Sequence, residues 1–346
     1  MNVHTILRLN SEPCIQFSEA QVHQLIMERP REFCELLERL YKAWNRNNDM
    51  VTLPYKQVFS THGTKGDFRV MPCVLNFEGK FIKAVKVIGT NEEERIVPDK
   101  ICVGRAMLLH PTDNFVQALF EVCSLSCFRT AAISVLAFKH SSPGLLRPGI
   151  IGAGRIGFYT ALFLKEWLGI REIAYFDLNP RRGEDFKFGV SLIGRVQALA
   201  FGSVEEISAA SDALFLCTNS PIPVISKKMA GHIPFVSSVG ADADNLSELA
   251  EDMAEGRRIL VDSIQSLSMG DLKRWEEKGL IRRDSVMEMR SIMGPEYRPD
   301  TKTLFISTGV AVQDALACQF LFDQSSLKAV LPPGKKLSAR GDGVYG

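Results

Sequence analysis

The chain has 346 residues, enough for two domains, since domains usually run to roughly 100–200 residues. Its hydrophobic fraction of 46% and charged fraction of 23% are ordinary for a soluble protein, and the net charge of +1 gives no global attraction to nucleic acid or to an acidic membrane. No run of about 18 apolar residues indicates a membrane span, and the first residues lack the pattern of a signal peptide. We therefore expect a cytoplasmic protein with no nucleic-acid or membrane partner.

The eight cysteines form no C-x-x-C pair. Cys123 and Cys127 are four residues apart on an expected helix, but no histidine or second cysteine pair joins them in a pattern typical of zinc. We expect buried, reduced thiols and no metal site.

The first 130 residues predict a small mixed domain. Residues 67–91 alternate polar and apolar around a Glu-Gly turn at 78–79, which predicts an antiparallel hairpin. Residues 106–121 predict a second hairpin that turns at 110–114. The apolar segment 121–143 then predicts a helix that leads into the next domain.

A glycine-rich segment, "GIIGAGRIGFYTALFL", begins at Gly149 and places Gly152, Gly154 and Gly157 in the spacing G-x-G-x-x-G. The segment follows a short apolar strand and continues as a helix, and a second strand leads to Asp177, 20 residues beyond the last glycine. In this motif the glycines permit a tight turn, a close approach to pyrophosphate, and packing of helix on strand. The free N–H groups of the helix N-terminus face the phosphates. The pattern predicts dinucleotide binding, although Pro148 indicates a strand that starts late.

Asp177 favours NAD as the cofactor, because a carboxylate accepts a hydrogen bond from the ribose 2′-OH and repels a 2′-phosphate. NADP is the alternative, because Arg181 and Arg182 follow closely and either could neutralise a phosphate. A solvated helix start is the simpler interpretation of the two arginines.

Strands and helices continue to alternate from about 145 to 300, which predicts a doubly wound parallel sheet. Ligands of such sheets bind beyond the carboxyl ends of the strands. Thr218 and Asn219 follow one of these ends, and Asp242 follows another.

With these features the chain resembles the ornithine cyclodeaminase/mu-crystallin family. The resemblance covers about residues 50–320, and its best marks are "RVMPCVL" at 69–75, "VKVIGTN" at 85–91, "CFRTAAISVLAFKH" at 127–140, "SSVGADADNLSEL" at 237–249 and "FISTGVAVQDALA" at 305–317. It implies nicotinamide chemistry at the Cα–N bond of amino acids and a homodimer. It also implies a substrate and dimerisation domain of residues 1–128 with 305–346, beside a Rossmann domain of residues 129–304.

By resemblance, Lys86 is a substrate-binding and catalytic lysine, Arg129 binds the substrate carboxylate, and Asp242 is the catalytic acid. Arginine pairs with a carboxylate through two parallel hydrogen bonds, lysine adds a point charge, and an aspartate at a strand end can exchange a proton. The simpler alternatives are a solvent-facing Lys86, an Arg129 that reaches from its helix to solvent, and an Asp242 that caps a helix in competition with Asp244. The cofactor side of the site is predicted at Gly152, Gly154, Arg155, Ile156, Gly157, Asp177, Thr218, Asn219, Val239 and Gly240.

Two departures from the family pattern concern the substrate. Many members carry an arginine before the first hairpin, where this chain offers only Lys56. The ornithine enzymes carry an acid two residues before the Met of "MP", where this chain has Arg69. An arginine there repels a distal ammonium and attracts a second carboxylate, unless it points outward from its strand.

Three functions follow as hypotheses. The first is an NAD-dependent dehydrogenase of an opine-like secondary amine, such as N-(2-amino-2-carboxyethyl)-glutamate of diaminopropionate and siderophore synthesis, acting through an imine. The second is a cyclodeaminase that recycles its NAD and releases ammonia. The third is a crystallin-like binding protein or ketimine reductase.

Overall fold

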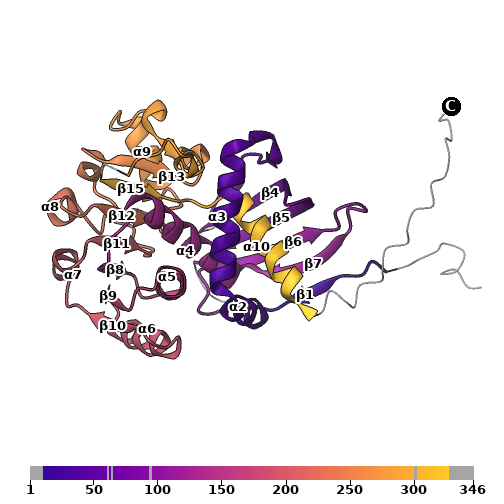
Figure 1. Cartoon of the computed structure of the whole chain (residues 1–346), viewed down its shortest axis with the longest axis horizontal. Helices are drawn as coiled ribbons and strands as arrows, with labels where there is room; N and C mark the ends of the chain where they lie inside the picture. The colour runs from indigo at the N-terminus through magenta and orange to yellow at the C-terminus, as the bar shows by residue number, and fades with distance from the viewer. Residues whose placement is uncertain (1–10, 61, 64, 93–95, 300–301, 327–346) are drawn as a thin grey trace, which may run out of the picture.

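The computed structural model describes residues 11–60, 62–63, 65–92, 96–299 and 302–326. Its strands form two sheets, one mostly antiparallel and one parallel, with helices between them (Figure 1). The mixed α/β class predicted from the sequence is confirmed.

The mostly antiparallel sheet has the strand order β1-β7-β6-β5-β4-β2, and β3 also pairs with β4. Both predicted hairpins are confirmed. In the first, Glu78 (φ 49°) and Gly79 (φ 75°) both adopt left-handed backbone, which matches the twist of paired strands. The strands are β1 (Ile15–Phe17), β2 (Val51–Thr52), β3 (Gln57–Ser60), β4 (Asp67–Phe77), β5 (Lys80–Thr90), β6 (Cys102–Leu109) and β7 (Val116–Glu121).

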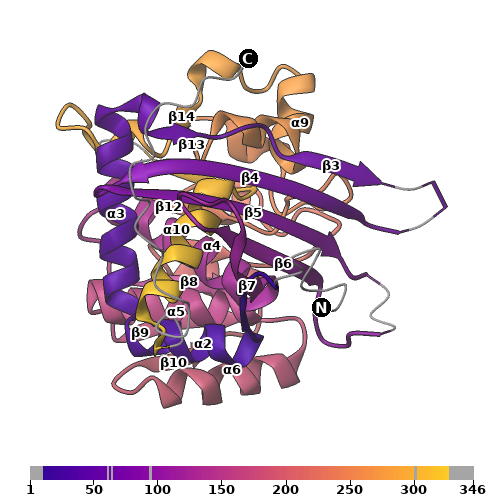
Figure 2. The same ribbon diagram turned by 90° about the vertical axis from the view of Figure 1, so that its right-hand side faces the viewer.

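Three helices lie against this sheet: α2 (Glu19–Glu28), α4 (Val122–Ser141) and α10 (Ala311–Gln324). A further helix, α3 (Pro30–Arg46), packs on α4, α5 and α10. Ser18 and Gln21 form a reciprocal capping box that starts α2, and Pro30 starts α3 where its missing N–H costs nothing. In Figure 2 the strands β4–β6 face the viewer with no labelled helix in front of them. The sheet thus has one covered face and one open face.

Helix α4 is the central helix of the molecule. Within the described part of the chain, it alone is long and apolar enough to cross a membrane, but 89% of its apolar window is buried inside the protein. Its apolar residues therefore serve packing between the two sheets (Figure 1).

The second sheet is parallel throughout, in the order β10-β9-β8-β11-β12-β15-β13-β14. Its central strands are buried on both faces, as expected where helices cover both sides. Its strands are β8 (Pro148–Ile151), β9 (Glu172–Phe176), β10 (Gln197–Ala200), β11 (Ala213–Leu216), β12 (Phe235–Ser238), β13 (Arg258–Val261), β14 (Met287–Glu288) and β15 (Thr303–Ile306). The associated helices are α5 (Arg155–Leu168), α6 (Pro180–Leu192), α7 (Val204–Ala210), α8 (Lys227–Ala230) and α9 (Gly270–Glu277), and short 3₁₀ turns span Asn48–Met50, Glu251–Ala254, Ile264–Ser268, Arg283–Ser285 and Ser291–Met293.

The extent predicted for the parallel sheet, about 145–300, was too short. Strand β15 lies inside the sheet between β12 and β13. Its four residues, Thr303–Ile306, are too few to show a periodicity that separates a buried strand from other buried segments. The division into domains stays a prediction. Its boundary at residue 305 falls within β15, a strand of the parallel sheet. Helix α10, which follows β15, packs against β4 and β5 of the antiparallel sheet. Residues 327–346 lie outside the described part.

Candidate functional site

The glycine loop lies between β8 and α5. Gly152 has φ +99°, and a Cβ atom there would lie 2.5 Å from the Cys217 carbonyl oxygen. A Cβ on Gly157 would lie 2.4 Å from the Gly152 carbonyl oxygen, whereas one on Gly154 would meet nothing within 4 Å. The outer glycines thus permit packing, and the middle one leaves open space at the N-terminus of α5, which no side chain caps. This combination fits a pyrophosphate.

Asp177 stands directly beyond β9 and contacts the loop. One carboxylate oxygen accepts the Ala153 N–H at 2.8 Å, and the other accepts the Asn179 N–H at 2.8 Å. The carboxylate is therefore fixed next to the loop, where a ribose hydroxyl would need an acceptor. Arg181 and Arg182 lie exposed at the start of α6. These residues fit an NAD-type dinucleotide.

The ends of β11 and β12 are joined by a buried acid that the sequence analysis missed. Glu248 accepts the Thr218 N–H at 2.7 Å, the Thr218 hydroxyl at 2.8 Å, the Ser238 hydroxyl at 2.7 Å and the Gly240 N–H at 2.8 Å. Burial raises the pKa of Glu248, and these four donors oppose the rise. Glu248 thereby fixes two of the predicted cofactor-side segments, 218–219 and 239–240.

Lys86 and Arg129 meet at a second missed acid, Asp314 on α10. Lys86 Nζ lies 2.7 Å from one Asp314 oxygen, and Arg129 Nε lies 3.1 Å from the other. All three side chains are buried, with Lys86 only 1% exposed, so the alternatives of a solvent-facing Lys86 and a solvent-reaching Arg129 are wrong. Burial lowers the pKa of Lys86 to about 8, although Asp314 opposes this.

A tight turn at 307–309 holds Lys56 and Arg129 in place. Lys56 Nζ donates to the Thr308 carbonyl oxygen at 2.7 Å. Gly309 has φ +77°, and a Cβ there would lie 2.5 Å from an Arg129 nitrogen, so the guanidinium packs directly on the turn. Burial lowers the pKa of Lys56 to about 8, and Asp242 and Asp262 oppose the shift.

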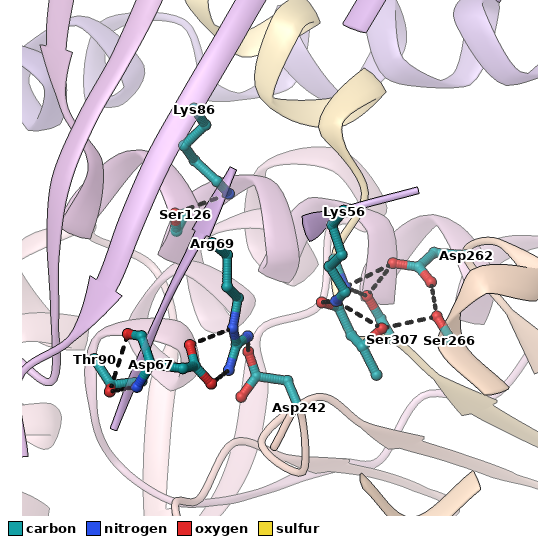
Figure 3. A network of polar contacts seen from close by, with 12 residues as sticks. Lys56, Asp67, Arg69, Lys86, Thr90, Ser126, Asp242, Asp262, Ser266 and Ser307 are labelled. Carbon is teal, nitrogen blue, oxygen red and sulfur yellow. Dashed lines mark hydrogen bonds and ion pairs between the residues drawn. The ribbon is translucent and has the colours of Figure 1, made fainter. Parts of the chain in front are cut away.

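Asp262, at the end of β13, builds this turn and was also missed. It accepts the hydroxyls of Ser266 and Ser307, each at 2.6 Å, and the Gly309 N–H at 3.0 Å (Figure 3). Its side chain is 1% exposed. A buried carboxylate with several donors shapes the backbone around it.

Arg69 connects the two sheets across the site. Its Nη1 donates to Asp242 Oδ2 at 2.7 Å, and its other nitrogens donate to the two oxygens of Asp67 at 2.8 and 3.1 Å (Figure 3). Arg69 is 6% exposed, so an outward-pointing side chain is wrong. Asp242 follows β12 in a loop rather than at a helix start, while Asp244 pairs with Lys273. The structure therefore gathers Lys56, Arg69, Arg129 and Asp242, with Lys86 attached through Asp314.

Sequence reasoning identified most side chains here but not their partners. Asp67, Asp262 and Asp314 belong to no sequence motif that marks them as partners of a cation. Only the fold brings them next to the cations. One signal in the sequence could have identified Asp314: it is an acid within the apolar segment "GVAVQDALA". An acid in such a segment is buried only when it is paired, which predicts a cationic partner.

A doubly wound parallel sheet with a glycine loop, joined to a smaller sheet that carries buried cations, defines a Rossmann-type protein with a second sheet. The chain belongs to the ornithine cyclodeaminase/mu-crystallin family, whose model matches residues 20–329. The expectation drawn from the sequence motifs is confirmed at this level.

Two curated relatives indicate the chemistry of the family. Iminosuccinate reductase of Paracoccus denitrificans is 25% identical over 276 residues, 78% of this chain and 82% of that protein. Ketimine reductase mu-crystallin of Rattus norvegicus is 24% identical, over 80% of this chain and 86% of that protein. Neither is an opine dehydrogenase, so that branch stays a hypothesis.

Two solved structures share the fold. Δ1-pyrroline-2-carboxylate reductase of Thermococcus litoralis, solved with NADH and L-proline, has a TM-score of 0.80 at 23% identity and covers 93% of this chain and 100% of that one. An archaeal alanine dehydrogenase dimer with bound NAD has a TM-score of 0.78 at 21% identity and covers 94% and 99%.

Proposed function

We propose that this protein is an NAD-dependent oxidoreductase that acts at the Cα–N bond of an amino acid or an opine-like secondary amine through an imine. One observation carries the proposal. Asp242, at the carboxyl edge of the parallel sheet that also carries the glycine loop, is bound by Arg69 and has Lys56 nearby. Arg129 and Lys86 share Asp314 beside them. Ligands of open α/β sheets bind at this edge.

The cations are suited to carboxylate recognition. Arg129 presents a planar fork that can hold an α-carboxylate through two hydrogen bonds, and Lys86 and Lys56 add point charges beside it. Asp314 and the turn at 307–309 keep these side chains in place before the substrate arrives. Such preorganisation reduces the entropy lost on binding.

Asp242 is suited to proton transfer at the substrate nitrogen or at an attacking water. When bound, the nicotinamide accepts or supplies the hydride at the substrate Cα. In the oxidative direction, Asp242 takes the proton from the amine, water adds to the resulting imine, and the adduct collapses to a 2-oxo acid and a free amine. Lys86 is the second residue proposed as catalytic. Its positive charge balances the negative charge of the substrate carboxylate while the imine forms.

Arg69 favours a substrate with a second carboxylate. By resemblance, Arg69 stands where the ornithine enzymes carry an acid for the distal ammonium. It is a buried cation whose nitrogens bind Asp67 and Asp242. Compounds such as N-(2-amino-2-carboxyethyl)-glutamate fit this requirement, and a siderophore pathway would use one. We expect a cytoplasmic enzyme.

A cyclodeaminase is the second candidate. Relatives named ornithine cyclodeaminase support it, such as that of Brucella suis at 27% identity over 63% of this chain. In that reaction the substrate's own distal amine attacks the imine and ammonia leaves, so no reduced cofactor accumulates. The positive charge of Arg69 argues against a cyclodeaminase, because it would repel the distal ammonium of the substrate.

A crystallin-like binding protein is the third candidate. The retained Lys86, Arg129 and Asp242 argue against a protein that only binds its ligand.

The same proposal includes a homodimer and NAD in preference to NADP. The open face of the antiparallel sheet carries exposed apolar side chains, among them Phe68, Val74 and Phe81, which a second copy could cover. The alanine dehydrogenase structure named above is a dimer.

Asp177 supports NAD, and the nearby Arg181 and Arg182 keep NADP as the alternative.

The reductive direction gives a first test. Purified protein with NADH and an equilibrium mixture of a 2-oxo acid and an amine should consume reduced cofactor only when both partners are present. Consumption with the 2-oxo acid alone would indicate a hydroxy-acid dehydrogenase and contradict the proposal.

A further inference from the structure

Two hydroxyl groups, those of Thr308 and Ser266, form a hydroxyl chain between Lys56 and the buried Asp262. Lys56 Nζ donates to Thr308 Oγ1 at 3.2 Å, Thr308 Oγ1 donates to Ser266 Oγ at 3.0 Å, and Ser266 Oγ donates to Asp262 Oδ1 at 2.6 Å. Figure 3 shows Lys56, Ser266 and Asp262 close together. Because Lys56 directly precedes β3 and the other three residues follow β15 and β13, the chain connects the two sheets.

The direction of each hydrogen bond in the hydroxyl chain follows from the partners of Asp262. Its carboxylate accepts from two backbone N–H groups and two hydroxyls, those of Ser263, Gly309, Ser266 and Ser307. A carboxylate has about four acceptor positions, so all are occupied by donors. The single hydroxyl proton of Ser266 therefore points to Asp262, and its oxygen accepts the hydroxyl proton of Thr308. The Thr308 oxygen is left to accept from Lys56.

The same contacts determine how many donors Lys56 can offer to a ligand. An ammonium group has three N–H donors. Thr308 accepts two of them, one at its carbonyl oxygen at 2.7 Å and one at its hydroxyl at 3.2 Å. Among the residues that the structure describes, no further acceptor contacts Lys56 Nζ. One N–H is thus left for a ligand, in contrast to the fork of an arginine.

We propose that Ser266 and Thr308 are positioning residues for the reaction, which connect Asp262 to Lys56, keep Lys56 protonated and direct its remaining N–H to the substrate carboxylate. The inference rests on the proposed function for the role of Lys56 in substrate binding. Each hydroxyl of the chain turns its oxygen toward the ammonium and its hydrogen toward the carboxylate. Aligned hydrogen bonds of this kind polarise one another, so the chain carries the attraction of Asp262 to Lys56.

The charges around Lys56 make this contribution decisive. Burial lowers the pKa of Lys56 to about 8, and the cations Arg69 and Arg129 act in the same direction. Asp242 and Asp262 favour the charged form. Lys56 is therefore mostly protonated at neutral pH with little margin, and loss of one favourable contact would leave much of it neutral and unable to attract a carboxylate.

The test follows the titration of Lys56 in the full chain without cofactor or substrate, by NMR of isotopically labelled lysine. The Lys56 signal is the one lost in Lys56→Arg, and its midpoint should lie near pH 8. Thr308→Val removes the hydroxyl at nearly constant shape and should lower the midpoint by about one pH unit, because a hydrogen bond to a charged group is lost. Thr308→Ser keeps the hydroxyl and should keep the midpoint.

Ser266→Ala interrupts the hydroxyl chain at its second member and should lower the midpoint in the same direction. Ser268→Ala is the matched control, because Ser268 lies in the same 3₁₀ turn and its hydroxyl donates to the Gln265 carbonyl oxygen instead. Far-UV circular dichroism establishes that each variant is folded. An unchanged midpoint in folded Thr308→Val and Ser266→Ala would overturn the proposal. An equal fall in Ser268→Ala would also overturn it, since any loosening of the turn would then suffice.

Kinetics separate this inference from the proposed function. With a substrate that turns over, the fall of kcat/KM at high pH should begin about one pH unit lower in Ser266→Ala than in the unmodified chain. A fall at the same pH in both proteins would overturn the inference. The NMR titration needs no substrate, so a shifted midpoint without turnover of any amine would support the hydroxyl chain and contradict the proposed function alone.

Discussion

Arg69 Nη1 lies 2.7 Å from Asp242 Oδ2, so an arginine of the antiparallel sheet holds the acid at the end of β12 in the parallel sheet. Asp67 binds the other side of the same guanidinium at 2.8 and 3.1 Å. These interactions raise the pKa of Arg69, whose charge is permanent. The cation is therefore shared between two acids across the candidate site.

Asp242→Asn should lower kcat by about 10²–10⁴-fold with little change in KM, because the amide keeps the shape but cannot exchange the proton. Steady-state kinetics with the dehydrogenase substrate measure both constants. Asp244→Asn is the matched control, since Asp244 is exposed and pairs with Lys273. Equal losses in the two variants would remove Asp242 from the proposed role.

Arg69→Gln should raise KM for a dicarboxylic secondary amine by roughly 10- to 100-fold, the loss expected for one hydrogen bond to a charged group. A monocarboxylic amino acid should be affected less. Arg105→Gln on β6 serves as control, because Arg105 is exposed and pairs with Glu121. If Arg69→Gln affects both substrate classes equally, Arg69 positions Asp242 and does not select the substrate.

The pH profile should report the buried lysines. Burial lowers the pKa of both Lys56 and Lys86 to about 8, so each loses its proton as the pH rises through that value. The charged form binds carboxylate, so kcat/KM should fall above about pH 8, by up to about tenfold per unit for one lysine. Lys86→Arg should weaken this decline, because arginine stays charged. A rate that rises through pH 8 would instead assign a lysine as general base.

Asp262→Asn should loosen the turn at 307–309. The buried amide cannot accept all the hydrogen bonds of Ser266, Ser307 and Gly309, which predicts a loss of about 1–3 kcal/mol in stability. KM should rise more than kcat falls, since Lys56 and Arg129 both rest on this turn. Denaturant unfolding and kinetics of the same preparation check this. Unchanged KM in a destabilised variant would limit Asp262 to a structural role.

Asp177→Ser should shift cofactor preference toward NADP. The substitution removes an acceptor for the 2′-OH and a charge that repels a 2′-phosphate, and it leaves Arg181 and Arg182 nearby. Fluorescence titration with NADH and NADPH gives the two affinities. A loss of both in parallel would mean that Asp177 only supports the loop through Ala153.

The sequence was most informative where local pattern determines structure. The glycine spacing, the 78–79 turn and the alternation of β4 and β5 each follow from neighbouring residues, and all three are as expected. Strand β15 was not predicted as part of the parallel sheet, because its four residues are too few to show a period and because its place between β12 and β13 depends on long-range pairing.

The acids that position the cations could not be predicted in the same way. Asp314 is 228 residues from Lys86, and Asp242 is 173 from Arg69, so only the folded chain pairs them. Motif resemblance supplied Lys86, Arg129 and Asp242 as candidates. The charge of Arg69 suggested a substrate class, but its simultaneous hold on Asp67 and Asp242 emerged only from the structure.

The most direct measurement of the central claim is incubation of the protein with NAD and a panel of ornithine, lysine, alanine and N-carboxyalkyl glutamates. Absorbance of the reduced nicotinamide and release of ammonia are followed together. The account predicts accumulation of reduced cofactor with a dicarboxylic secondary amine. Ammonia released from ornithine without net reduction would contradict it and identify a cyclodeaminase.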